Sequence, residues 1–278
     1  VPRVLFAFTA GSGLALCGMV FQAMFRNPLA TPFTLGVASG ASLGAAFSVY
    51  SGISFTILGL SATSLSAFAG ALLAISLVYS ISRFRFGFSG ETLLLTGVAI
   101  SFFFSSLILL IQYLSNVADS FQIIRWLMGS LTVVGYQELK QLLPFVALTA
   151  AVILFLSREL NLLKAGDEIA ISRGVSVKVV RYTLFFVTSL CVGAIVALCG
   201  PIGFVGMMVP HICRLIIGED HRYLIPATLL FGGSFLVICD TLARLIVAPA
   251  ELPVGVLTTL LGGPFFLWLL MRQHKKLY

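Results

Sequence analysis

Long stretches without a charged residue are the feature that most constrains this chain. The first lies between Arg3 and Arg26 and holds about twenty residues, enough for a helix to cross the ~30 Å hydrocarbon core of a bilayer. Only 10% of the residues are charged, against about 25% in an average soluble domain, and 59% are hydrophobic. The sequence therefore predicts an all-α polytopic membrane protein.

Nine transmembrane helices are predicted from where these stretches begin and end. Prolines and glycines supply breaks that charges do not: Pro28 and Pro32 end the first span, and Gly200 with Pro201 divides a run too long for one crossing. Residues 117–140 are of mixed polarity and are expected to form an interfacial loop with a short helix. The spans are expected at about 4–25, 32–50, 53–82, 92–116, 141–157, 182–199, 202–213, 223–247 and 253–271.

The distribution of positive charge orients these spans. If the turns alternate between two sides, 13 of the 17 Lys and Arg residues fall on one side, and the other keeps only Arg3, Arg125, Lys140 and Arg244. The richer side is therefore expected to face the cytoplasm. An odd number of spans without an initiating Met predicts one more helix upstream, giving ten, with a removed signal peptide as the weaker alternative.

A polar segment at 158–181 divides the single transmembrane domain, 1–278, into a first half at 1–157 and a second half at 182–278. It carries eight charged residues, a density that a membrane interior does not tolerate, so it is expected in water or against another protein. The sequence ALCG occurs at 15–18 and 197–200, in spans predicted to run in opposite directions, as inverted repeats would place it. Chance matching is the alternative.

Small residues recur at helical spacing. Gly36, Gly40 and Gly44 are four residues apart, as are Gly11 and Ala15, so helix backbones are expected to approach closely there. Packing within one subunit is the preferred interpretation, and a dimer seam is the alternative.

Patterns that carry catalysis or bind metals are mostly missing from the sequence. It contains no GxxxxGK[ST] or HExxH, and its three histidines do not cluster with carboxylates at metal-ligand spacing. The five cysteines sit inside apolar runs without CxxC spacing and are expected to be buried small hydrophobes. Asp240 is the one acidic residue expected within a span, and Arg244 one turn later can neutralise it.

Three segments carry a resemblance to a known family. They read VPRVLFAFTAGSGLALCGMVFQAMFRNPLATPFTLGVASGASLG, ALCGPIGFVGMMVPHICRLIIGEDHRYLIP and DTLARLIVAPAELPVGVLTTLLGGPFFLWLL. In these the chain resembles the permease subunits of bacterial ABC importers for iron siderophores, haem and cobalamin, and the match runs along essentially its whole length. The resemblance implies a type II ABC importer permease fold with two pseudo-symmetric halves and ten helices, of which this chain would lack the first.

The same resemblance implies the partners. Two permeases, identical or paralogous, would form a dimer around the path in the bilayer of a bacterial cytoplasmic membrane. Two ATPase subunits would dock on the cytoplasmic side, and an extracytoplasmic substrate-binding protein would dock on the outer face. The chain is expected to catalyse nothing and to bind no cofactor or metal itself, because ATP and Mg²⁺ would sit on the ATPase. Nucleic acid is not an expected partner, since the +7 charge fits cytoplasmic turns.

Three groups of site residues follow from the resemblance. An ATPase-coupling loop with two short helices would fall at 160–177, and a merely solvated loop is the alternative. Its residues are Leu160, Leu163, Lys164, Ala165, Gly166, Asp167, Glu168, Ile169, Arg173 and Gly174. Docking of the binding protein would use Arg3 and Arg244, although Arg244 could instead serve Asp240. A cytoplasmic gate would be formed by Asn27, Pro28, Leu29, Ser89, Gly90 and Glu91.

The expected function is translocation of an iron chelate, with a siderophore as the first candidate and haem or cobalamin next. A stand-alone secondary transporter is the competing class, which the scarcity of carboxylates within the spans disfavours. A membrane-embedded enzyme is a third class, for which the sequence offers no catalytic constellation.

Overall fold

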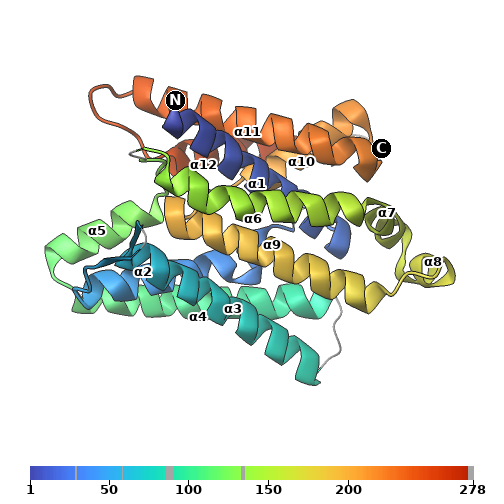
Figure 1. Cartoon of the computed structure of the whole chain (residues 1–278), viewed down its shortest axis with the longest axis horizontal. Helices are drawn as coiled ribbons and strands as arrows, with labels where there is room; N and C mark the ends of the chain where they lie inside the picture. The colour runs from blue at the N-terminus through green and yellow to red at the C-terminus, as the bar shows by residue number, and fades with distance from the viewer. Residues whose placement is uncertain (29, 58, 86–89, 133–134, 275–278) are drawn as a thin grey trace.

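The computed structural model describes residues 1–28, 30–57, 59–85, 90–132 and 135–274, which form a bundle of helices lying roughly along one axis (Figure 1). The helices in chain order are α1 (Pro2–Phe25), α2 (Val37–Tyr50), α3 (Ala62–Arg85), α4 (Gly90–Leu114), α5 (Val117–Leu127), α6 (Gln137–Phe155), α7 (Ser157–Ala165), α8 (Asp167–Ser172), α9 (Val177–Cys199), α10 (Val205–Ile217), α11 (His221–Leu245) and α12 (Val254–His274).

Six of the described helices are long and apolar enough to cross a membrane: α1, α3, α4, α6, α9 and α11. The apolar parts of α2, α10 and α12 are shorter. The 14 residues of α2 rise only about 21 Å at 1.5 Å per residue, because Pro32–Leu35 form a separate 3₁₀ turn before it. The multi-pass architecture is therefore confirmed, whereas the count of nine crossings stays a prediction.

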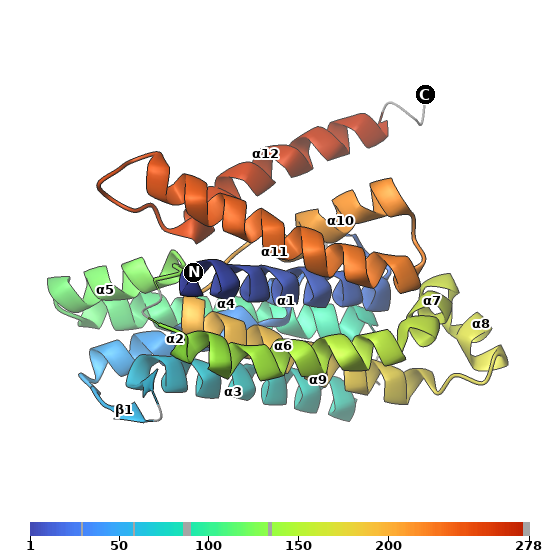
Figure 2. The same cartoon turned by 45° about the horizontal axis from the view of Figure 1, so that its top comes forward.

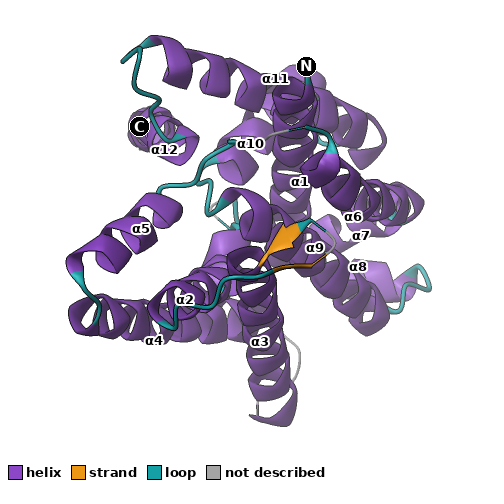
Figure 3. Cartoon of the chain, turned by 60° about the vertical axis from the view of Figure 1, so that its left-hand side comes forward, coloured by secondary structure: helices purple, strands orange, loops and turns teal. Residues whose placement is uncertain are grey.

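A β-hairpin stands where the sequence predicted the start of the third span. Strands β1 (Thr56–Ile57) and β2 (Leu60–Ser61) pair antiparallel, with Thr56 opposite Ser61 (orange in Figure 3). The long helix accordingly begins at Ala62 and not after Gly52. The predicted start of the third span was therefore wrong, whereas the mostly helical fold is confirmed. An apolar run marks a segment as buried or membrane-bound but does not fix where its helix starts.

Other predicted breaks agree with the structure. The short helix expected within 117–140 is α5, and the chain leaves helix between Cys199 and Val205, around Gly200 and Pro201. The second half predicted to begin at 182 has its first helix, α9, starting five residues earlier at Val177. All five cysteines are buried and free, as expected.

Helix α1 lies at the centre of the bundle and packs against α6, α9, α10 and α11. Small residues make this possible. A Cβ added at Gly18 would come within 1.7 Å of the Gly206 carbonyl oxygen, and one at Gly11 within 2.4 Å of the Gly232 carbonyl oxygen. The helices thus touch through their backbones, which favours close packing where lipid supplies no hydrophobic drive.

The glycine row on α2 forms a similar contact with α3. A Cβ at Gly40 would meet the Gly70 carbonyl oxygen at 2.5 Å, and one at Gly44 would meet the Ser66 carbonyl oxygen at 2.0 Å. The predicted packing within one subunit is confirmed for these two residues. Gly36 is different, because it precedes the helix with a left-handed φ of 78°.

The bundle has two distinct ends (Figures 1 and 2). One holds α7, α8 and the turn at 218–220 between α10 and α11, and is called the α7–α8 end below. The other holds the N-terminus, α5, the hairpin and the connection at 246–253, and is called the α5 end. The polar segment at 158–181 and the mixed segment at 117–140 thus lie at opposite ends, as the alternation of the turns predicts.

Candidate functional site

The segment predicted to couple to an ATPase forms two short helices, α7 and α8, joined at Gly166. Gly166 has φ 138° and ψ 150°, a conformation that side-chain-bearing residues rarely adopt. Its N–H donates to the Leu162 carbonyl and its own carbonyl accepts from Ala170, so it ends one helix and starts the next. The sharp change of direction between α7 and α8 therefore depends on glycine.

The two helices divide their faces differently. Leu160 and Leu163 of α7 are buried in the main hydrophobic core. Ile169 and Ile171 of α8 are exposed, with 48% and 62% of their surface accessible. Segment 160–177 therefore has an anchored face and a free apolar face. Among the other predicted coupling residues, the exposed ones are Ala165, Glu168, Arg173 and Gly174.

Asp167 ties the start of α8 to two long helices. Its Oδ1 accepts a hydrogen bond from Arg26, at the end of α1, and another at 2.8 Å from Arg181 of α9. Arg181 is almost fully buried although it lies in the polar segment. Asp167 also follows Gly166 in the first turn of α8, where a negative charge suits the helix dipole.

Asn161 fastens α7 to the beginning of α11, and we call Asn161, Asp220 and His221 the Asn161 clamp. The Asn161 Oδ1 accepts from the His221 backbone N–H at 3.0 Å and lies 2.6 Å from His221 Nδ1. The Asn161 Nδ2 donates to Asp220 Oδ1 at 2.8 Å. One amide side chain thus satisfies three groups of another element.

An ion pair reinforces the clamp. Lys164 Nζ lies 2.6 Å from Glu219 Oε2, and this contact with Lys164 lowers the pKa of the Glu219 carboxyl. The pKa of Asp220 is also lowered, first by the Arg222 backbone N–H and then by Asn161. In the sequence, GEDHR at 218–222 indicated only a charged turn, and no local signal connects it with Asn161.

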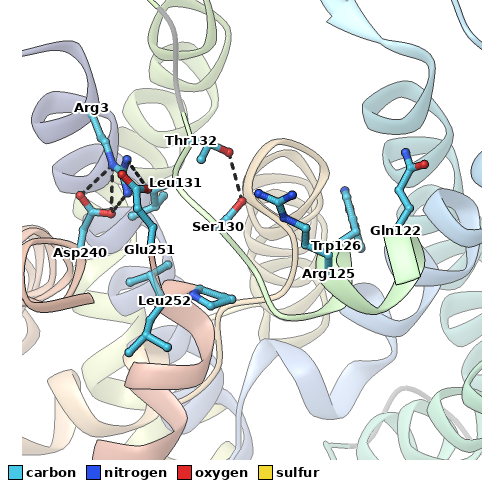
Figure 4. A pocket seen from close by; sticks show the side chains of 12 residues that line it. Arg3, Gln122, Arg125, Trp126, Ser130, Leu131, Thr132, Asp240, Glu251 and Leu252 are labelled. Carbon is cyan, nitrogen blue, oxygen red and sulfur yellow. Dashed lines mark hydrogen bonds and ion pairs between the residues drawn. The ribbon is translucent and has the colours of Figure 1, made fainter. Parts of the chain in front are cut away.

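At the α5 end, Asp240 is shared by two arginines, Arg3 and Arg244. Figure 4 shows Arg3 between Asp240 and Glu251. The guanidinium of Arg3 donates to both Asp240 oxygens through Nε, at 3.1 and 3.0 Å, and through Nη2 at 2.8 Å. Its Nη1 reaches Glu251 at 2.9 Å. Arg244 approaches Asp240 Oδ2 with Nε at 3.3 Å. Such forked pairing is specific to arginine, and lysine could not reproduce it.

This arrangement bears on the two predicted docking arginines. Arg244 does neighbour Asp240, as the alternative interpretation held, but Arg3 is the stronger partner and was not anticipated. Arg244 keeps more of its side chain exposed than Arg3 does. Both arginines lie at the same end of the bundle, and the docking role of either stays a prediction.

A cavity of about 260 Å³ opens beside this cluster. Arg3, Asp240 and Glu251 line one side of it, and Arg125 and other residues at the end of α5 line the opposite side (Figure 4). Within the part of the chain that the structure describes, Arg125 makes no ion pair. The cavity therefore combines neutralised charges on one wall with an available guanidinium on the other.

The predicted gate is only partly described. Asn27 and Pro28 follow α1, where the Asn27 N–H donates to the Gln22 carbonyl and Ala30 donates back to Asn27. Leu29 and Ser89 lie outside the described residues. Gly90 and Glu91 begin α4, and nothing is described of the Glu91 side chain. The gate therefore stays a prediction.

No group of three or more His, Cys, Asp or Glu residues that could hold a metal occurs within the described ranges. His211 is half-buried, and its ring packs edge-to-face against that of Phe265 with 6.3 Å between the ring centroids.

Comparison with known proteins identifies the relatives of the chain. The model of the FecCD transport family matches residues 1–272. The hemin transport system permease protein HmuU of Yersinia pestis is 40% identical over 277 residues, which is 99% of this chain and 83% of HmuU. The cobalamin import system permease protein BtuC of Halobacterium salinarum is 41% identical over 286 aligned positions, 99% of this chain and 73% of that protein.

Other relatives carry names for import of ferric citrate, in Bacillus subtilis, and of molybdate, in Haemophilus influenzae. A solved structure described as an inward-facing metal-chelate type ABC transporter superposes with a TM-score of 0.89 at 33% identity, covering 98% of this chain and 85% of that one. This chain therefore belongs to the FecCD transport family and is a multi-pass membrane permease of the ABC importer type.

Proposed function

We propose that this chain is the transmembrane subunit of a binding-protein-dependent ABC importer in which α7 and α8 receive the movement of a separate ATPase subunit. One observation carries the proposal. The segment is anchored inward through Leu160 and Leu163 while Ile169 and Ile171 of α8 face outward. Exposed apolar side chains on a short helix that follows a buried anchor suit a docking contact with another protein.

The proposed cargo is an iron chelate, with a siderophore first and haem or cobalamin next. Support comes from the range of relatives, whose names include hemin, cobalamin and ferric citrate, all metal complexes of organic ligands. The relative named for molybdate widens that range to a simple oxyanion. We place the choice of cargo in the substrate-binding protein, since the described residues offer no metal-ligand cluster.

The proposed assembly contains two permease chains, identical or paralogous, two ATPase subunits and an outer binding protein, in the cytoplasmic membrane of a bacterium. The α7–α8 end faces the cytoplasm in this arrangement, in keeping with its Lys and Arg residues. Closure of the ATPase pair on ATP would move α7 and α8, and through Asp167 and the Asn161 clamp would move α1, α9 and α11. The turn at Asn27 and Pro28, with the one at 89–91, would close the path on this side.

The test is recovery of a co-expressed ATPase subunit with the tagged chain. Ile169→Ser together with Ile171→Ser removes the apolar face of α8 and leaves Leu160 and Leu163 in place. We expect at least a tenfold lower recovery of the ATPase. Ile217→Ser is the matched control, because Ile217 lies at the same end outside the segment and is 49% exposed, against 48% for Ile169. It should leave recovery unchanged.

Two other outcomes decide against the proposal. If both variants recover the ATPase as the wild type does, α8 is not the docking face. If a folded, inserted wild-type chain never associates with an ATPase, the importer function fails for this chain and a stand-alone secondary transporter becomes the leading candidate.

We further propose that Arg244 meets an acidic side chain of the binding protein, since it is the more exposed of the two arginines on Asp240. Arg244→Gln should slow association of the binding protein several-fold and reduce its dependence on salt, because complementary charge mainly speeds encounter. Lys140→Gln is the control, a loss of the same charge from an exposed site at the same end. Equal association rates for the two variants would remove Arg244 from the interface.

A further inference from the structure

A second cavity lies at the α7–α8 end, between α1, α7, α10 and α11, with a volume of about 370 Å³. Three cationic side chains line it, Arg26, Lys164 and Arg214, against one carboxylate, Glu219. It is separate from the cavity of Figure 4, which lies at the other end of the bundle.

The cations of this cavity are not equally available. Arg26 is paired with Asp167, and Lys164 is paired with Glu219. Arg214, in the last turn of α10, makes no hydrogen bond or ion pair with any residue in the described part of the chain. Its guanidinium is therefore the donor group that a ligand would engage.

Two deeply buried side chains in the cavity wall have an acceptor atom without a partner. Gln22 is 4% exposed, and its Nε2 donates to the carbonyls of Gly206 and Met207 at 3.4 and 3.1 Å, which fixes the orientation of the amide. Its Oε1 has no hydrogen-bond partner. A buried polar atom is rarely left in this state in a folded protein.

The second acceptor is Nε2 of His221, a residue that is 1% exposed. Because Asn161 donates to Asp220 through Nδ2, its Oδ1 must act as an acceptor toward the His221 ring. The proton of the neutral imidazole therefore sits on Nδ1, and Nε2 presents a lone pair without a partner. A ligand of this cavity must therefore both donate hydrogen bonds and carry negative charge.

These requirements select a chemical class. A guanidinium binds phosphate oxygens with forked geometry, and the two acceptors need O–H or N–H donors. Because Arg26, Lys164 and Arg214 line the cavity, a cationic N–H donor such as an ammonium is disfavoured, which leaves hydroxyl groups. A carboxylate or sulfate provides the charge without the hydrogens, and water provides the hydrogens without the charge. A phosphate that carries hydroxyl groups provides both, either as hydrogen phosphate or as the phosphoglycerol headgroup of a lipid.

The setting favours the lipid. Leu215 lines the cavity and is largely exposed, and Ile216 beside it is equally exposed, so an apolar surface adjoins the charged pocket. Basic side chains at the cytoplasmic boundary attract anionic headgroups. We propose that this cavity is a binding site for a hydroxyl-bearing phosphate, occupied in the membrane by an anionic lipid of the phosphatidylglycerol type.

The experiment titrates the purified full chain with lipids of identical acyl chains and counts bound lipid by native mass spectrometry. The wild type should bind one phosphatidylglycerol at least tenfold more tightly than phosphatidylcholine. Phosphatidylethanol, which has the same charge without hydroxyls, should bind several-fold more weakly than phosphatidylglycerol. Equal binding of phosphatidylglycerol and phosphatidylcholine overturns the proposal, and equal binding of the two anionic lipids overturns the role of Gln22 and His221.

A variant and a competitor complete the test. Arg214→Gln should lower phosphatidylglycerol affinity to the level of phosphatidylcholine, while Arg222→Gln, an exposed arginine of the same end that does not line the cavity, should not. Unchanged binding by a folded Arg214→Gln chain overturns the site. If inorganic phosphate at millimolar concentration displaces the lipid, this result supports the site. If phosphate binds but the lipid does not, the site belongs to the free ion. The comparison of lipids on the wild-type chain still tests the proposal if the Arg214→Gln chain does not fold.

Discussion

The two ends of the bundle hold their charges in opposite ways. At the α5 end, one carboxylate, Asp240, is 3% exposed and is shared by two arginines from distant parts of the chain. At the α7–α8 end, the carboxylates of Asp167 and Glu219 are 36% and 71% exposed. A buried pair is costly to break, whereas exposed pairs contribute little each and exchange readily with water. The α5 end is therefore expected to be rigid, and the α7–α8 end is expected to change conformation more easily, so we call the latter the yielding end.

The largest effect is expected from Asp240→Ala. The change leaves Arg244 without a carboxylate and Arg3 with only the half-exposed Glu251, so we expect a loss of about 3 kcal/mol in unfolding free energy. Unfolding of the detergent-solubilised chain measures it. Glu219→Ala is the counterpart at the other end and should cost less than about 1 kcal/mol. Similar losses from both variants would erase the contrast between the ends.

A smaller effect is expected from Asn161→Ala, which removes the partners of His221 and Asp220 in the Asn161 clamp. Loss of these bonds should cost about 2 kcal/mol and should speed hydrogen exchange of the α7 amides selectively. The control is Asn116→Ala, which removes the cap of α5 at the opposite end and should leave α7 exchange unchanged. Unchanged α7 exchange in the Asn161→Ala chain would show that the clamp does not hold α7.

Gly166→Ala tests the junction within the yielding end. The nearest atom to an added Cβ is 3.9 Å away, so the cost comes only from φ 138° and should be about 1 kcal/mol. We expect transport to fall more than the amount of protein in the membrane. Gly203→Ala is the control, since the nearest atom to an added Cβ is 3.5 Å away, an ordinary contact, and its φ is not left-handed. Equal falls in transport and in membrane protein would indicate misfolding instead.

The smallest effect on stability is expected from lowering the pH. Lys164 lowers the pKa of Glu219 in the folded chain, so this pair adds stability above the ordinary carboxyl pKa and loses it as pH falls through the lowered value. Because Glu219 is exposed, the change should stay below about 1 kcal/mol. Acid titration of α7 hydrogen exchange in wild type and Glu219→Gln measures it. The variant should show a smaller acid-dependent step, because Asp220, whose pKa is also lowered, still holds α7 through Asn161. A step of equal size in both chains would assign it to another group.

The parts of the fold that were predictable from the sequence are those encoded locally. Uncharged stretches located the long helices, and Gly200 with Pro201 located the break before α10. The hairpin at 56–61 was missed because four residues paired over a turn leave no periodic signal. Two short helices were expected within 160–177 only through the family resemblance, and the structure has them at 157–165 and 167–172.

The contacts of the candidate sites were predictable only where they are short-range. Arg244 lies one turn from Asp240, so that pairing followed from helical spacing. Arg3 lies 237 residues from Asp240, and Asn161 lies 60 from His221. Such partners are set by how α1, α7 and α11 pack, and a single sequence carries no record of that packing.

The burial of α1 has a consequence for how the chain is made. Most of its apolar window, 78%, is buried in the bundle, against 22% for α4. Yet the carbonyls that accept from the Gln22 side chain belong to Gly206 and Met207, which the ribosome adds 184 and 185 residues later. During synthesis α1 is therefore in the membrane before the helices that contact its glycines and its Gln22 amide have been made. Quality-control proteases would meet this intermediate, so a lesion in α10 should appear as rapid turnover of the nascent chain rather than as an inactive permease.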